Sequence, residues 1–267
     1  MRDERRNDPA GLETPALPGF ALITGGGRGI GASIARALAA GGWRVAVAGR
    51  TREQLEAVAN EIGGWALVGD VSRRDDVERW FAEAGEVDLL VNNAGIASGG
   101  LPAWEEEPHE WWRVFEVNVL GAFLCCRTVL PGMIDRGRGR IINVSSNFAF
   151  LPVRGRSILE SAYSTSKAAL CRFSGVLNEQ TSGHGVFVFT VSPGLVRSDM
   201  TRGVFPEDAP WTPPELAPRL VRAIAEGRLD SLAGRYLHAE HDPVVEPERR
   251  ADEIIAQDLN AIRLRRK

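Results

Sequence analysis

Tyr163 and Lys167 are two side chains that could together perform acid–base chemistry. On a helix, residues four apart lie on the same face. A free phenol has a pKa of about 10, so it exchanges protons poorly near neutral pH. An ammonium about 4 Å away favours the phenolate by up to about 4 kcal/mol at an effective dielectric constant of about 20, which lowers the pKa of the phenol by up to about 3. The spacing therefore predicts a tyrosine that exchanges a proton with a substrate oxygen.

Lysine is rare in this chain, which strengthens that interpretation. Lys167 and Lys267 are the two lysines among 32 lysine and arginine residues, and Tyr163 and Tyr236 are the two tyrosines. Arginine fills the other cationic positions, and its planar fork cannot replace a compact, rotatable ammonium. The alternative is an exposed helical pair with no role in catalysis.

A glycine-rich turn, TGGGRGIG at residues 24–31, joins a predicted strand to a predicted helix. Glycines allow the backbone to turn sharply and to approach a pyrophosphate, which the N–H groups of a helix N-terminus bind. We therefore predict a dinucleotide site here, with a simple tight turn as the alternative. Its predicted binding residues are Gly25, Gly27, Arg28, Gly29, Ile30 and Gly31.

The second predicted strand ends at Gly49-Arg50, where an NAD site usually has an acidic residue for the ribose hydroxyl. Arg50 and Arg28 instead offer two cations to a 2′-phosphate, which carries a charge of up to about −2. This pattern predicts that NADP(H) is preferred and that NAD(H) is the alternative cofactor. Arg50 as a solvated surface residue is the competing interpretation.

Apolar strands and amphipathic helices alternate along the chain and predict an α/β fold with a parallel sheet covered on both faces. The predicted strands are 20–25, 43–49, 65–70, 87–95, 139–146, 185–194 and 234–239, and the predicted helices are 29–42, 51–64, 72–85, 105–136 and 162–182. We expect Ser72 to cap the third helix. Residues 1–18 predict a flexible arm, residues 19–267 a single domain, and the proline-rich residues 199–233 a loop and helix that select the substrate.

The composition argues against several classes of partner. The 267 residues carry a net charge of −3, which gives no reason to expect nucleic acid or an acidic membrane. The N-terminus lacks the apolar stretch of a signal peptide, and no apolar run approaches the roughly 18 residues that cross a bilayer. Cys125, Cys126 and Cys171 lack the spacing of a disulfide framework, so we expect a soluble protein of the cytoplasm.

Several further motifs follow the glycine turn in order along the chain. They are Asp70-Val71, Asn92-Asn93-Ala94-Gly95, Asn118, Ser145-Ser146, Tyr163-x-x-x-Lys167 and Pro193-Gly194. Together with the turn, they resemble the short-chain dehydrogenases/reductases over about residues 19–198. The resemblance implies a single Rossmann-type, doubly wound parallel sheet of about seven strands, with helices on both faces.

The resemblance also implies a role for each catalytic position. Tyr163 would be the acid–base, and Lys167 would hold the ribose hydroxyls and lower the pKa of the tyrosine. Ser146, rather than Ser145, would bind the substrate oxygen, and Asn118 would hold a water that links the lysine to solvent. Without the other motifs, we would interpret Ser146 or Asn118 as an ordinary polar residue of a turn or helix.

The resemblance implies that the remaining matched positions bind the cofactor. Asp70 and Val71 would contact the adenine, and Asn93, Ala94 and Gly95 would pass near the ribose. The residues beside the nicotinamide would be Pro193, Gly194, the Val196 backbone and the Ser198 hydroxyl. Family resemblance further suggests a homotetramer or homodimer that assembles through the helices at 105–136 and 162–182.

The chain departs from the family between Ser146 and Tyr163, where the gap is longer than usual. The extra residues fall in 151–161, which leaves the choice between the two adjacent serines open and suggests a remodelled substrate edge. Arg154 and Arg156 in this segment could meet an anionic substrate, with solvated loop arginines as the alternative.

Aromatic and histidine residues give weaker signals. We expect Phe148, Phe205 and Trp211 to lie nearest the substrate, because they flank the serine motif and the Pro193 segment. His238 and His241 are metal-type ligands, but no supporting cluster accompanies them in the sequence, so no metal site is predicted.

These features predict an NADP(H)-dependent oxidoreductase that transfers a hydride between the nicotinamide and a carbonyl or secondary alcohol of a small organic substrate. A non-redox dehydratase or epimerase on the same scaffold is the enzymatic alternative. A cofactor-binding sensor without turnover is the alternative of another class. The set of Tyr163, Lys167, Ser146 and Asn118 argues against a sensor, because a pure binder needs only the glycine turn.

Overall fold

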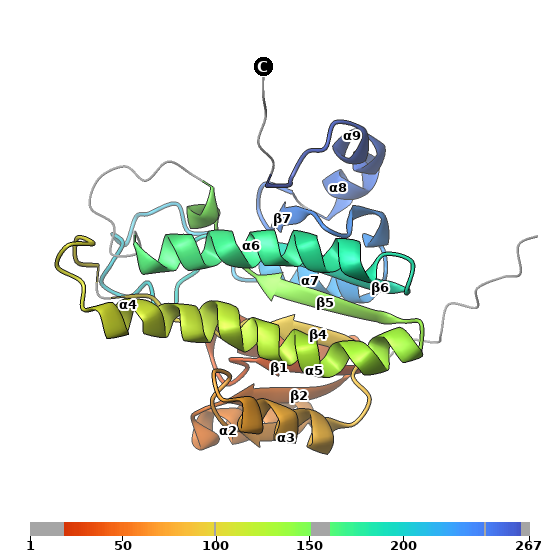
Figure 1. Ribbon diagram of the computed structural model, residues 1–267, viewed down its shortest axis with the longest axis horizontal. Coiled ribbons are helices and arrows are strands. Elements are labelled where there is room, and N and C mark those ends of the chain that lie inside the picture. The colour runs from red at the N-terminus through yellow and green to blue at the C-terminus, as the bar shows by residue number, and fades with distance from the viewer. Residues whose placement is uncertain (1–18, 99, 151–160, 243, 263–267) are drawn as a thin grey trace, which may run out of the picture.

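A seven-stranded parallel sheet forms the centre of the computed structural model, which describes residues 19–98, 100–150, 161–242 and 244–262. The strands lie in the order β3-β2-β1-β4-β5-β6-β7, and each neighbouring pair is parallel (Figure 1). The strands are β1 (Phe20–Thr24), β2 (Arg44–Gly49), β3 (Trp65–Val68), β4 (Leu89–Asn92), β5 (Gly139–Val144), β6 (Val186–Ser192) and β7 (Tyr236–His238). The predicted α/β fold is confirmed, and the arm predicted for residues 1–18 lies outside the described residues.

Helices cover both faces of this sheet. One buried apolar cluster joins α1, α2 and α7 to one face, and a second joins α3, α5 and α6 to the other. The helices are α1 (Gly29–Ala40), α2 (Arg52–Ile62), α3 (Arg74–Ala84), α4 (Pro108–Phe115), α5 (Gly121–Asp135), α6 (Ala162–Thr181), α7 (Leu216–Ala225), α8 (Val245–Arg249) and α9 (Ala251–Ala256), with short turns η1 (Glu116–Leu120), η2 (Asn147–Ala149) and η3 (Asp230–Leu232). Loops and turns precede α7 within the predicted substrate segment 199–233.

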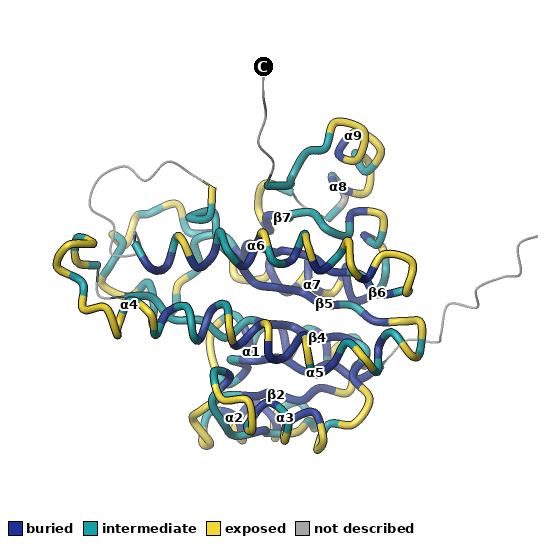
Figure 2. Tube along the Cα trace, viewed as in Figure 1, coloured by how far each residue is buried: buried dark blue, intermediate teal, exposed yellow. Residues whose placement is uncertain are grey.

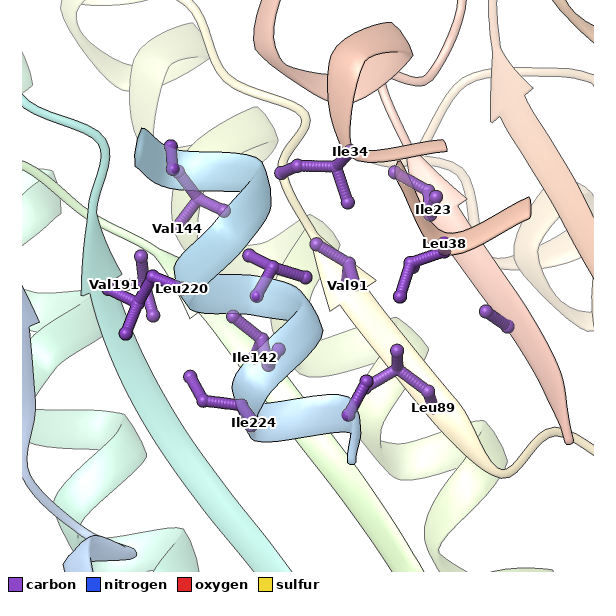
Figure 3. Close-up of a cluster of buried hydrophobic side chains, with 14 of the residues drawn as sticks. Ile23, Ile34, Leu38, Leu89, Val91, Ile142, Val144, Val191, Leu220 and Ile224 are labelled. Atoms are coloured by element: carbon purple, nitrogen blue, oxygen red, sulfur yellow. The ribbon is translucent and has the colours of Figure 1, made fainter. Parts of the chain in front are cut away.

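The strands are mainly apolar, as expected of strands that are covered on both faces. In β1, Ala21 and Ile23 pack in the cluster beneath α1 and α7, whereas Phe20 and Leu22 pack in the opposite cluster. Figure 3 shows α7 lying over the central strands, with Leu220 among the packed side chains. The tube in Figure 2 shows the strands as buried layers between more exposed helices. This packing fixes the carboxyl ends of the strands, near which many of the predicted site residues lie.

The helix predicted over 105–136 runs from Pro108 to Asp135, but a π-helical turn, η1, interrupts its hydrogen bonding. Such turns occur often at functional sites, and this one carries the buried Asn118. The apolar pattern of the sequence did not predict the π-helical turn, because a change of hydrogen bonding over one turn leaves that pattern nearly intact.

The helix from Pro108 to Asp135 is long and apolar enough to cross a membrane by length and composition, and half of its most apolar window is buried in the fold. The prediction that no apolar run approaches that length was therefore wrong, although a core helix passes the same test.

Ser72 does not cap α3, contrary to the prediction. The helix begins at Arg74, and no side chain caps its N-terminus. Ser72 instead donates its backbone N–H and its hydroxyl to one carboxylate oxygen of Asp70, at 2.9 and 2.7 Å. The serine therefore fixes the orientation of a residue that follows β3.

Candidate active site

A cavity of about 750 Å³ opens at the carboxyl ends of the central strands, between the glycine turn and the segment after β6. This is the edge at which open parallel sheets bind ligands, beside the point where the strand order reverses between β1 and β4. Among the predicted site residues, its lining includes Gly25, Gly27, Arg28, Gly29, Ile30, Arg50, Asp70, Val71, Asn93, Ala94, Gly95, Tyr163, Lys167, Pro193, Ser198, Phe205 and Trp211. The predicted residues that do not line it are Gly31, Asn118, Ser146, Phe148, Gly194 and Val196.

The glycine turn is closely packed on one side and open on the other. Gly25 has a φ of +63°, and a Cβ there would lie 3.0 Å from the Ala94 Cα. A Cβ at Gly31 would lie 2.3 Å from the Gly25 carbonyl oxygen. Gly29, at the first position of α1, has a φ of +53° and would place a Cβ in open space. The turn therefore leaves room for a phosphate beside the N-terminus of α1.

The two predicted phosphate-binding arginines differ in their surroundings. The Arg28 guanidinium lies 2.5 Å from a carboxylate oxygen of Asp199, whose other oxygen lies 2.6 Å from Arg202. Arg50 is exposed at the cavity. Asp199 was not among the predicted site residues, because its partner is 171 positions away in the chain and no motif connects them.

Asp70 is held by a second residue that the sequence did not single out. Arg113 of α4 donates to Asp70 at 2.6 Å and to the Ser72 hydroxyl at 2.8 Å. Burial raises the pKa of the Asp70 carboxyl, but the hydrogen bonds from Ser72 and Arg113 outweigh it and hold the pKa below its usual value. The carboxylate is therefore ionised and oriented at neutral pH.

Tyr163 and Lys167 share one side of the first two turns of α6, as their spacing predicted, and both line the cavity. The Lys167 Nζ lies 5.6 Å from the centre of the Tyr163 ring. The same Nζ donates a hydrogen bond of 2.8 Å to the carbonyl of Val144, the last residue of β5. The amine is thus tied to the sheet rather than to the phenol oxygen.

Burial dominates the ionisation of both groups. It raises the pKa of the Tyr163 phenol to about 12, against a hydrogen bond with Ser146 that lowers it. It lowers the pKa of Lys167 to about 8, although the nearby Cys171 thiol has the opposite influence. The pKa of Tyr163 is therefore raised and not lowered, contrary to the prediction, because loss of water disfavours the phenolate more than the hydrogen bond with Ser146 favours it.

The two adjacent serines have different surroundings. Ser145 is buried, donates to the Lys167 carbonyl at 3.2 Å and lies 3.0 Å from the Cys171 sulfur. Ser146 caps η2, and its side chain bonds with Tyr163. Ser145 lines the cavity and Ser146 does not, whereas Ser146 is the serine that bonds with the tyrosine, so the substrate-binding role of Ser146 stays a prediction.

Asn118 fixes the chain after β4 beside Lys167. Its Oδ1 accepts from the Ile96 N–H at 2.9 Å, and its Nδ2 donates to the Ile96 carbonyl at 3.0 Å and to Ser166 at 2.9 Å. A Cβ on Gly95 would lie 3.3 Å from both the Asn118 oxygen and the Lys167 Nζ. Both N–H groups of the amide are thus engaged, and the water-holding role of Asn118 stays a prediction.

The segment after β6 forms the far wall of the cavity. It closes on itself where Leu195 and Thr212 exchange two hydrogen bonds, at 2.9 and 3.1 Å. Within it, Phe205 and Trp211 line the cavity with their rings edge to face, and Arg197 lies over the Trp211 ring at 4.6 Å. Two other expected residues, Arg154 and Arg156, lie outside the described residues.

Phe148 packs against Tyr163 and does not line the cavity wall. Its ring meets the Tyr163 ring edge-on, with the two centres 6.3 Å apart. Its place among the substrate-binding residues stays a prediction.

Residues 19–209 match the family model described as short chain dehydrogenase. The chain belongs to this family. The chain is 40 % identical over 199 residues to a short chain dehydrogenase of Pseudocercospora fijiensis (strain CIRAD86). The match covers 71 % of this chain and 62 % of the relative, so the chain spans less than two thirds of the length of that relative. It is 36 % identical to the NADP-dependent 3-hydroxy acid dehydrogenase of Salmonella typhi, covering 66 % of this chain and 71 % of the relative.

A solved structure of a metagenomic short-chain oxidoreductase in complex with NADP has the same fold as this short-chain dehydrogenase. The two share 35 % sequence identity and a TM-score of 0.66, and the match covers 77 % of this chain and 90 % of that chain.

Gly31→Ala should weaken NADPH binding to this short-chain dehydrogenase by about tenfold or more, because the new Cβ forces the turn to shift. Gly175→Ala, on α6, is the matched control, since a Cβ there meets nothing within 4 Å. NADPH fluorescence titration measures both dissociation constants. Equal constants for the two variants would show that the turn does not bind the cofactor.

Proposed function

We propose that this protein is an NADP(H)-dependent oxidoreductase that transfers a hydride between the nicotinamide and a carbonyl or secondary alcohol of a small organic substrate. One observation carries the proposal: the phenol of Tyr163 and the amine of Lys167 line the same cavity as an open glycine turn. A proton donor and a dinucleotide cradle within one cavity are what carbonyl reduction requires.

The bound nicotinamide supplies the hydride chemistry, and the protein supplies orientation and a proton. Because burial raises its pKa to about 12, the Tyr163 phenol is protonated at neutral pH and can donate to a carbonyl oxygen. Ser146 bonds with the same phenol and would hold the substrate oxygen next to it. The pKa of Lys167, about 8, allows its amine to lose and regain a proton near neutral pH. In the reverse direction, Tyr163 must first lose its proton, and the resulting phenolate then takes the proton of the alcohol.

The cofactor preference follows from the cations at the cavity. The Salmonella relative is NADP-dependent and the metagenomic structure contains NADP. Asp199 already neutralises part of the charge of Arg28, so Arg50 carries most of the preference for a 2′-phosphate. We propose NADP(H) as the preferred cofactor, with Arg28 and the glycine turn holding the phosphates.

Substrate selection is proposed for residues 199–233, where Phe205 and Trp211 present aromatic rings to the cavity. The assembly proposed is a homotetramer or homodimer through helices 108–135 and 162–181. Trp112 and Phe123 are 57 % and 44 % exposed on the first of these helices, more than large apolar side chains usually are. The cytoplasmic location stays a prediction.

Tyr163→Phe should lower kcat by about 10²–10⁴-fold, because it removes the proton donor and leaves the ring in place. NADPH affinity should stay within about twofold of wild type, since the hydroxyl contributes little to a site held by many contacts. NADPH oxidation with a carbonyl substrate and NADPH fluorescence measure the two quantities. Full turnover by the variant would exclude Tyr163 as the acid–base.

Arg50→Asp should reduce the ratio of kcat/KM with NADPH to kcat/KM with NADH by at least about tenfold, because a carboxylate repels the 2′-phosphate. Arg52→Asp is the control, since Arg52 is exposed nearby but does not line the cavity. An unchanged ratio in Arg50→Asp would contradict the assignment of this cation.

A screen of small carbonyl compounds with NADPH and NADH in parallel separates the proposal from its alternatives. Loss of the reduced-nicotinamide absorbance in step with substrate supports the oxidoreductase. Product formation with no net change in absorbance identifies a dehydratase or epimerase. Cofactor binding without any product identifies a sensor.

A further inference from the structure

A hydrogen-bonded cluster of side chains lies behind the catalytic serine, and none of the roles described above accounts for it. The amide of Asn147, the residue after Ser146, lies 2.9 Å from the His238 Nε2 and also bonds with the Tyr236 hydroxyl. Tyr236 and His238 both belong to β7, at the edge of the sheet. The amide thus joins the turn after β5 to a strand two positions away in the sheet.

Both ring nitrogens of the histidine in this cluster have hydrogen-bond partners. Its Nδ1 accepts the backbone N–H groups of Glu240 and His241, at 3.2 and 3.1 Å. Burial lowers the pKa of His238, so the ring is neutral at neutral pH. The other ring nitrogen, Nε2, lies 2.9 Å from the Asn147 Nδ2. The amide oxygen of Asn147 accepts from the Tyr236 hydroxyl, so the two ends of the amide bridge the histidine ring to Tyr236.

Tyr236 extends the cluster to β6. Its hydroxyl also bonds with Ser192, the last residue of β6, which pairs with His238 in the sheet. Its ring packs edge-on against Phe150, with the ring centres 4.6 Å apart. The cluster therefore connects the carboxyl ends of three adjacent strands.

The location of the cluster suggests what it does. Ser146 directly precedes Asn147, and Pro193, expected beside the nicotinamide, directly follows Ser192. The turn η2 contains no buried residue, and the ring of Phe148 packs edge-on against Tyr163. The hydrogen bonds of the cluster add to this packing in holding the turn. A misplacement of about 1 Å in a catalytic group can lower a rate by about 10²-fold, so this rigidity matters for turnover.

We propose that Asn147, Tyr236 and His238 are positioning residues that hold the Ser146 hydroxyl against Tyr163 and keep the segment that begins at Pro193 in register with it. This inference rests on the proposed function for its effect on turnover. It also gives His238 a role other than metal binding. The residues described contain no group of three or more metal-type ligands.

Tyr236→Phe tests the proposal most cleanly, because it removes one hydroxyl and keeps the ring against Phe150. We expect kcat to fall about tenfold. The KM of NADPH should stay within about twofold, because the cluster does not contact the glycine turn. Phe150→Leu is the matched control: it alters the ring packing, breaks no hydrogen bond of the cluster and should leave kcat within about twofold.

A pair of substitutions at His238 separates hydrogen bonding from packing. His238→Gln keeps a polar group that can hydrogen-bond with Asn147 at a similar reach, so it should retain more of the wild-type kcat than His238→Leu, which has none. Retention of kcat by Tyr236→Phe and His238→Leu would overturn the proposal. The proposal would also be overturned if kcat fell in proportion to the melting temperature across all four variants, Phe150→Leu included. Such a correlation would show a general effect on stability.

Hydrogen exchange provides a readout that does not depend on activity. The N–H groups of Phe148, Ala149 and Phe150 are bonded within the turn that begins at Ser146. They should exchange about tenfold faster in Tyr236→Phe than in wild type, and unchanged exchange would contradict the positioning role. If wild type shows no hydride transfer with any substrate, the proposed function fails. Faster exchange in the variant would still support the role of the cluster in holding the turn.

Discussion

Burial of two ionisable side chains, Tyr163 and Lys167, is the constraint on which the site depends. Removal from water disfavours the charged form of each, so the pKa of the phenol rises to about 12 and that of the amine falls to about 8. A protonated phenol is the correct starting state for donation to a carbonyl oxygen. The same burial makes the reverse reaction demanding, because the phenolate must then be stabilised by a positive charge brought close to it.

The fold meets this constraint by bringing several strand ends to one edge of the sheet. The carbonyl of Val144 fixes the lysine amine, and Asn118 holds the segment that passes beside it. The turn after β5 places Ser146 at the tyrosine, and the segment after β6 closes the cavity. Each of these groups follows a buried parallel strand, so the packing of the two apolar clusters determines the geometry of the chemistry.

Local pattern predicted the elements, whereas contacts between distant segments were not predictable. The alternation of apolar strands and helices, the glycine turn and the four-residue spacing on α6 all follow from neighbouring residues, and each appears in the structure. The pairing of Asp199 with Arg28 and the bond from Arg113 to Asp70 join residues far apart in the chain. Spacing also predicted the wrong direction for the tyrosine pKa, because spacing reports proximity and not the loss of water.

The most direct test is a titration of Tyr163, taken as the difference in phenolate absorbance between the wild type and the Tyr163→Phe variant, which retains Tyr236 as its sole tyrosine. Phenolate absorbance after stopped-flow pH jumps reports the ionisation before the protein unfolds. The account predicts a pKa of about 12 for the protein alone and a lower value with saturating NADP⁺, because the oxidised nicotinamide brings a positive charge into the same cavity. Ionisation near the ordinary value of about 10 in the protein alone, or a pKa that NADP⁺ leaves unchanged, would contradict it.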